Sequence, residues 1–70
     1  MIDKIKSIIC QFVDIDEGEI KEDSNLRSDI GLNSLDLMSV ATEMENVFGM
    51  SISEKKILSM KTVSDLIDCI

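Results

Sequence analysis

Apolar residues recur every three or four positions in the first and middle parts of this chain, which is the spacing of one face of an α-helix. In the first part they predict a helix over about residues 2–14. In the middle part they predict a helix that begins near Asn33 or Ser34 and ends at Gly49, a residue suited to a left-handed C-cap. The apolar face of the first helix consists of Ile2, Ile5, Ile8, Ile9, Phe12 and Val13. That of the second consists of Leu37, Met38, Ala41, Met44, Val47 and Phe48.

Capping residues mark the helix starts. Asn33 is a favoured N-cap, and Asp36 three residues later completes a capping box. Ser53 caps a short third helix, and Thr62 caps a last helix with Asp65 as its reciprocal partner. Ile52 and Ile57 fit a hydrophobic staple around the Ser53 cap, and the apolar side of the third helix is expected to consist of Met50, Ile57, Leu58 and Met60. The last helix is expected to bury Val63, Leu66, Ile67 and Ile70.

The segment over residues 16–33 is acidic, and its apolar residues are irregularly spaced. We therefore expect a long loop that is pinned onto the core by Ile20, Leu26, Ile30 and Leu32. The whole pattern predicts an all-α fold: a small four-helix bundle with three longer helices, one short helix and a long first connecting loop. Seventy residues are near the lower size limit for a hydrophobic core, so residues 1–70 are expected to form a single domain.

The net charge of −7 narrows the range of partners. Nucleic acid and anionic membranes would be repelled, whereas a basic protein surface would be attracted. No segment is apolar enough to insert into a membrane, so we expect a cytoplasmic protein, and a monomer because of its charge. Cys10 and Cys69 are expected to be buried free thiols.

The residue types that are missing exclude several chemistries. Without histidine there is no Ser-His-Asp triad and no ordinary zinc site, and there is no Gly-rich phosphate loop or CxxC motif. Residues 14–18 resemble the start of a calcium loop, but Glu19 stands where glycine is required and Asn25 where the last ligand should be glutamate. We therefore predict no catalytic residue and no metal site.

Ser34 has two interpretations from the residues alone. It lies where an acidic loop meets a strongly amphipathic helix, a position at which serine is favoured for capping. Alternatively it is a point of attachment, because a phosphate bonded there would face the unpaired N–H groups of a helix N-terminus. The chain supplies no base that would make Ser34 a nucleophile.

The motif around Ser34 resembles the signature of the acyl carrier protein family, Asp-Leu-Gly-x-Asp-Ser-Leu. Residues 29–36 read DIGLNSLD, and the similarity continues at residues 44–49 (MENVFG), 52–53 (IS) and 61–68 (KTVSDLID). With the opening amphipathic helix, the resemblance covers essentially the whole chain.

This resemblance implies a carrier and not an enzyme. A phosphopantetheinyl transferase would attach 4′-phosphopantetheine from coenzyme A to Ser34, with Asn33 and Leu35 beside it. The thiol of that arm would carry acyl groups as thioesters between acyl-transferring or synthase enzymes. An acyl chain would enter a pocket formed by Met38, Ala41, Met44 and Leu58, although core filling also explains these residues.

The partner surface that the resemblance implies begins at Leu35, which either meets the transferase and other enzymes or is partly buried against the loop. Asp36, Glu43 and Glu45 would face basic docking surfaces, or they form an ordinary solvated helix face.

Two departures from the family pattern affect the predicted function. Asn33 replaces the usual aspartate before the serine, and Ser39 and Asn46 stand where fatty-acid carriers often have acids. These departures favour a dedicated pathway over primary fatty-acid synthesis. Cargo stays open among fatty-acyl, polyketide, aminoacyl, D-alanyl and peptidyl groups, and a carrier fold that is never modified is a further alternative.

Overall fold

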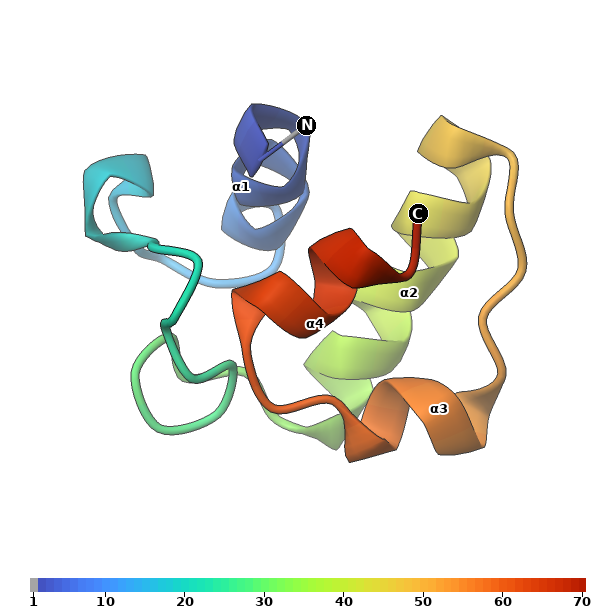
Figure 1. The fold of residues 1–70 in the computed structure, drawn as a ribbon. Helices are drawn as coiled ribbons and strands as arrows, with labels where there is room; N and C mark the ends of the chain where they lie inside the picture. Colours follow the sequence, from blue (N-terminus) through green and yellow to red (C-terminus); the bar gives the residue numbers. More distant parts are fainter. Residues whose placement is uncertain (1) are drawn as a thin grey trace.

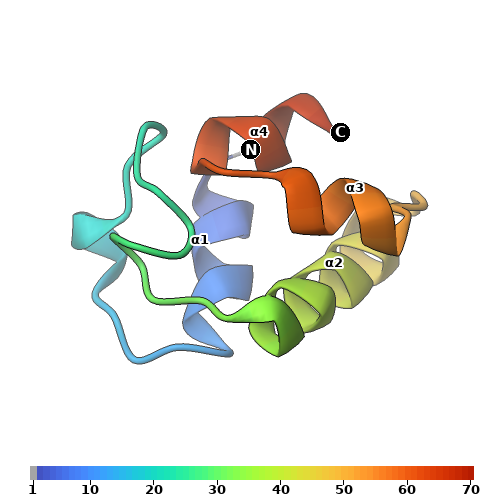
Figure 2. The same cartoon turned by 90° about the horizontal axis from the view of Figure 1, so that it is seen from below.

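The computed structural model describes residues 2–70, which fold into four α-helices and one short 3₁₀-helix (Figures 1 and 2). The elements are α1 (Ile2–Cys10), η1 (Glu17–Glu19), α2 (Ser34–Phe48), α3 (Glu54–Ser59) and α4 (Val63–Asp68). The prediction of an all-α, four-helix fold is confirmed for the described residues. The expectation of three longer helices is wrong, because α4 has six residues, as many as α3.

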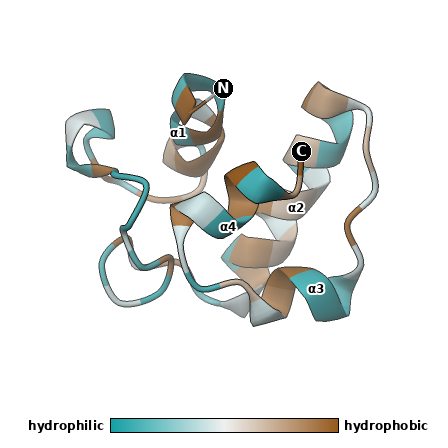
Figure 3. Ribbon diagram, viewed as in Figure 1, coloured by the Kyte–Doolittle hydropathy of each residue, from teal (hydrophilic) through white to brown (hydrophobic). Residues whose placement is uncertain are grey.

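The core lies between α1, α2 and α4, while α3 packs mainly on α2 (Figure 1). The buried apolar residues of the helices and the long loop form one cluster, and Figure 3 colours the ribbon by the hydropathy of each residue. The fully buried large side chains are Ile5, Ile9, Ile20, Leu26, Leu37, Val40, Met44, Ile57, Val63 and Leu66.

α1 ends four residues earlier than its apolar pattern predicts. After Cys10 the chain tightens, because the N–H groups of Gln11 and Phe12 donate to carbonyls three residues back, at 3.1 and 3.0 Å. Phe12 and Val13 are half-buried and pack on the core from outside the helix. Apolar periodicity thus continued beyond the helical backbone.

The long loop is held on the core as expected, because its four apolar residues, Ile20, Leu26, Ile30 and Leu32, are all buried. Backbone hydrogen bonds also join it to the chain around the start of α4. The N–H of Leu26 donates to the carbonyl of Lys61 at 2.8 Å. In return the N–H groups of Val63 and Ser64 donate to carbonyls of residues 24 and 22, at 3.1 and 2.8 Å. A bridge between residues 25 and 62 completes this junction.

α2 begins and ends at the predicted residues. Gly49 adopts a left-handed conformation (φ 64°) at the C-cap, where its N–H donates to Glu45. One position of the predicted apolar face is wrong: Val47 is 47% exposed, whereas Val40, which the prediction omitted, is fully buried. Val47 lies near the C-terminal end of α2, where its side chain lines a shallow depression beside Lys4.

The caps of α3 and α4 are also confirmed. The Ser53 hydroxyl accepts from the N–H of Lys56, and Thr62 and Asp65 form a reciprocal capping box. Ile70 was expected to be buried but is 44% exposed, because it lies beyond the last residue of α4.

The two cysteines are free but only half-buried, so the expectation of buried thiols was partly wrong. The Cys10 thiol donates to the Ile15 carbonyl at 3.3 Å. Desolvation, followed by the nearby charges of Glu17 and Asp16, raises the pKa of the Cys10 thiol. None of the described helices is long and apolar enough to cross a membrane.

Candidate functional site

Ser34 is the first residue of α2 and is solvent-exposed. The capping box beside it fixes its backbone. The Asn33 side-chain oxygen accepts from the N–H of Asp36 at 2.8 Å, and the Asp36 carboxylate accepts from the N–H of Asn33 at 3.2 Å. This reciprocal pair holds the first turn in register and leaves the Ser34 hydroxyl facing solvent.

Two backbone N–H groups in the first turn of α2 have no hydrogen-bond acceptor among the described residues. The N–H of Asp36 is bonded to the cap, and that of Leu37 bonds to the Asn33 carbonyl at 2.9 Å. Among the described residues, the N–H groups of Ser34 and Leu35 have no acceptor. Unpaired N–H groups together with the helix dipole favour an anion at this position.

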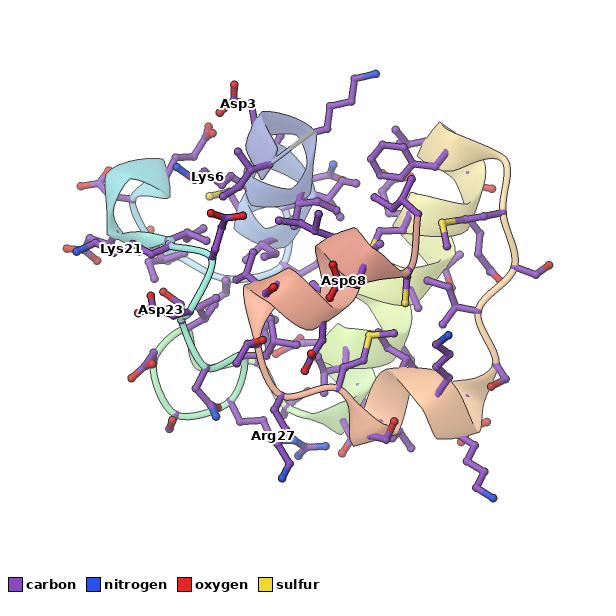
Figure 4. All side chains as sticks on the ribbon, viewed as in Figure 1. Asp3, Lys6, Lys21, Asp23, Arg27 and Asp68 are labelled. Atoms are coloured by element: carbon purple, nitrogen blue, oxygen red, sulfur yellow. The ribbon has the colours of Figure 1, made fainter. Side chains whose placement is uncertain are left out.

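Arg27 contacts Ser34 from the long loop. Its guanidinium Nη2 donates to the Ser34 hydroxyl oxygen at 3.4 Å, and Figure 4 shows Arg27 at the same end of the molecule as the start of α2. Sequence reasoning missed this residue. It lies seven positions before Ser34 in a loop without periodicity, so no local pattern indicated that the two side chains meet.

The residues predicted to meet partner enzymes do not share one face. Leu35 is 71% exposed, the most exposed large apolar side chain described. Asp36 and Glu43 are seven residues apart, so they lie on the same side of α2, whereas Glu45 lies nine residues after Asp36, on the opposite side. Glu45 also accepts a hydrogen bond from the N–H of Ile52 at 2.8 Å, which ties the α2–α3 connection to α2.

A cavity of about 180 Å³ lies between α2 and α3. Two of the four predicted pocket residues, Met38 and Ala41, line it. Met44 does not, because it is fully buried in the core, and Leu58 lines a separate depression beside Arg27. The other lining residues are Thr42, Glu45, Ile52, Glu54 and Ile57, which the sequence interpretation did not assign to the pocket.

Metal ligands do not gather anywhere in the described part of the chain: no group of three or more histidine, cysteine, aspartate or glutamate residues is placed to hold an ion. The start of α2 presents an exposed hydroxyl, two N–H groups without an acceptor among the described residues, and the guanidinium of Arg27. These groups suit a phosphate ester.

Comparison with known proteins gives the family to which this arrangement belongs. Residues 3–70 match the model of the phosphopantetheine attachment site family. The chain belongs to this family of carrier domains. It is 39% identical over 67 residues to an acyl carrier protein of Coprothermobacter proteolyticus, a match that covers 96% of this chain and 82% of that protein. It is 33% identical over 67 residues to the acyl carrier protein of Thermotoga maritima, covering 96% and 83%.

The fold of this carrier domain agrees with its family. A solved structure from Mycobacterium tuberculosis, assigned as an acyl carrier protein, superposes with a TM-score of 0.87 at 31% identity. The superposition covers 97% of this chain and 90% of that one. Membership in this family implies a covalently attached 4′-phosphopantetheine group and the role of a carrier, not of an enzyme.

Proposed function

We propose that Ser34 carries the phosphopantetheine arm and that this protein is a discrete carrier of acyl thioesters in fatty-acid, polyketide or related biosynthesis. The observation that carries the assignment of Ser34 is its exposed hydroxyl at the start of α2, next to two N–H groups without an acceptor in the described chain. An esterified phosphate would accept hydrogen bonds from these groups and interact favourably with the helix dipole.

The cavity between α2 and α3 supports an acyl cargo. Its volume of about 180 Å³ is close to the roughly 150 Å³ of an apolar cavity that holds benzene, but it is open to solvent, and Thr42, Glu45 and Glu54 line it beside the apolar residues. A short acyl chain would rest against its apolar side, formed by Met38, Ala41, Ile52 and Ile57. A longer chain would require α3 to move. α3 has only six residues, and the Glu45–Ile52 hydrogen bond closes its connection to α2. An aminoacyl, D-alanyl or peptidyl cargo would need no such cavity.

Partner enzymes would approach the end of the molecule that carries Ser34. Leu35 offers an exposed apolar contact, and Asp36 and Glu43 lie on the same side of α2, suited to a basic docking surface. Glu45 would contribute less, because its carboxylate is bonded to the chain before α3. The start and outer face of α2 are less acidic than in many fatty-acid carriers because of Asn33, Ser39 and Asn46, and this favours a dedicated pathway. The protein would act in the cytoplasm as a monomer.

The attachment is tested by intact mass after incubation with coenzyme A and a broad-specificity phosphopantetheinyl transferase. We expect one added group on the wild type and on Ser28→Ala, a matched change at another exposed serine of the loop, and none on Ser34→Ala. Loading of Ser34→Ala would contradict the assignment. If the wild type is not loaded but Asn33→Asp is, the protein requires a dedicated transferase. If neither is loaded, the chain is a carrier fold that is not modified.

The cargo is tested by comparing NMR spectra of the protein loaded with a six-carbon acyl group, an aminoacyl group or the bare arm. We expect the acyl group to shift methyl signals of Met38, Ala41 and Ile57, which line the cavity, and to leave Ile5 unchanged because it lies in the core away from the cavity. Equal spectra for the acyl-loaded form and the bare arm would contradict an acyl cargo held in this cavity.

A further inference from the structure

Arg27 is the one charged side chain of the described residues that hydrogen-bonds to Ser34. We propose that it holds the phosphodiester of the arm and thereby fixes the direction in which the arm leaves the protein. This inference rests on the proposed attachment to Ser34. Arg27 would act as a positioning residue, because the thiol that carries the cargo lies at the far end of the arm.

The backbone places Arg27 before any ligand is attached. The Asn25 side-chain oxygen accepts from the N–H groups of Arg27 and Ser28, each at 2.9 Å. Asp29 closes the same turn by accepting from the N–H of Asn25 at 2.8 Å. The neighbouring Leu26 is buried and bonded to the Lys61 carbonyl. The backbone of the turn that carries Arg27 is therefore anchored on both sides, so that mainly the exposed side chain must be ordered when a ligand binds.

Esterification of Ser34 would replace a neutral hydrogen-bond acceptor of Arg27 with an anionic one. In the unmodified protein the contact at 3.4 Å joins a guanidinium to a neutral hydroxyl, a long hydrogen bond. In the loaded protein the same oxygen would be bonded to phosphorus, and the two non-bridging oxygens of the phosphodiester would share one negative charge. The planar fork of arginine matches these oxygens with charge-assisted hydrogen bonds. The guanidinium is already close enough to form them by rotation of its side chain.

The negative charge of the protein is a reason why a cation is needed next to the phosphodiester. The arm adds a negative charge to a chain whose net charge is already −7. Arg27 offsets that charge at the point of attachment, and it shares a depression with a second cation, Lys61, on the chain between α3 and α4. The depression continues from Arg27 along Leu58, Ser59 and Met60, so it offers a surface on which the arm can lie.

The sequence contains a single arginine, so the one arginine side-chain NMR signal belongs to Arg27 and needs no further assignment. We would record the arginine Nε–H signal in three forms: Ser34→Ala, unmodified wild type and loaded wild type. On loading we expect the signal to move and its hydrogen exchange with water to slow about 1.5- to 5-fold, the range for an exposed charge pair. Faster exchange on loading, or exchange equal to that of Ser34→Ala, would overturn the proposal.

Two variants separate a direct contact from general electrostatics. Lys61→Gln removes the same charge from the same depression and should keep the slowed exchange of the arginine signal. Arg27→Gln should narrow the ³¹P signal of the loaded protein, because the phosphodiester becomes more mobile, and Arg27→Lys should restore the width only in part. Loss of the effect in Lys61→Gln, or an unchanged ³¹P width in Arg27→Gln, would contradict a phosphate clamp.

The mass spectrum of each sample keeps the two proposals apart. If neither the wild type nor Asn33→Asp gains an arm, the attachment to Ser34 is refuted. A loaded wild type with an unmoved arginine signal refutes only the role of Arg27.

Discussion

The N-termini of α2 and α4 begin with the same motif but serve different purposes. Each has a reciprocal capping box, formed by Asn33 with Asp36 in α2 and by Thr62 with Asp65 in α4. In α4 the next N–H groups are bonded to carbonyls of the long loop. In α2 the corresponding groups have no acceptor among the described residues, and the serine beside them is exposed.

This difference shows that a capping box specifies a helix start and not a binding site. What distinguishes α2 is the surface around its cap. The loop covers the start of α4 with backbone carbonyls, whereas at the start of α2 it contributes the Arg27 guanidinium. One N-terminus therefore anchors the loop, and the other is left available for an anion.

The largest expected effect is the loss of stability when the apolar anchor of the loop is removed. Leu26→Ala should lower the free energy of unfolding by about 2–5 kcal/mol, because the side chain is fully buried beside the junction with α4. Urea denaturation measures this effect. Leu35→Ala is the matched control and should change stability by less than about 0.5 kcal/mol, because Leu35 is exposed. Equal losses in the two variants would mean that Leu26 does not anchor the loop.

The two caps should contribute similarly to stability but differently to loading. Asn33→Ala and Thr62→Ala should each cost about 1 kcal/mol, the usual value of an N-cap side chain. Well below the melting temperature, only Asn33→Ala should slow attachment of the arm, because its cap fixes the backbone next to Ser34. Loading rates followed by mass spectrometry test this, with Asn33→Ser as a variant that keeps a capping oxygen. A similar slowing in Thr62→Ala would contradict the distinction.

The smallest effect is a pH dependence at the α4 cap. Hydrogen bonds from the N–H groups of Lys61 and Thr62 lower the pKa of the Asp65 carboxyl below its ordinary value. A lowered folded-state pKa contributes stability above the unfolded pKa of about 3.9, and this contribution is lost as the pH falls through the folded value. The stability difference between wild type and Asp65→Asn should therefore be constant from about pH 7 to 5 and shrink below about pH 4. A difference that grows in acid would contradict this assignment.

Much of the fold was predictable because its signals are local. The capping pairs and Gly49 identified the starts of three helices and the end of α2, and the irregular apolar residues of the loop were correctly placed in the core. One error lies inside α2, where Val47 is exposed and Val40 is buried. The others came where apolar residues follow a helix, as with Phe12, Val13 and Ile70. Such residues continue the periodic pattern whether or not the backbone stays helical.

The site was predictable only in part. The position of Ser34 at the start of α2 and its cap follow from adjacent residues. Arg27 could not be found in this way, because its approach depends on the path of the loop, and that path depends on bonds to residues 61–64. Met44 and Leu58 do not line the cavity between α2 and α3, because periodicity gives the apolar face of a helix but not which part of that face borders a cavity. Their assignment to an acyl pocket stays a prediction.

The junction between the loop and the start of α4 has a consequence for synthesis on the ribosome. Leu26 obtains its backbone partner from Lys61, so the loop that presents Arg27 to Ser34 cannot be complete until that later segment has left the exit tunnel. A nascent chain in which Ser34 has emerged but Lys61 has not still lacks the bond that holds the loop in place. We expect a transferase that recognises the folded site to act only after residues 61–64 have emerged from the ribosome, so that incomplete chains are left without an arm.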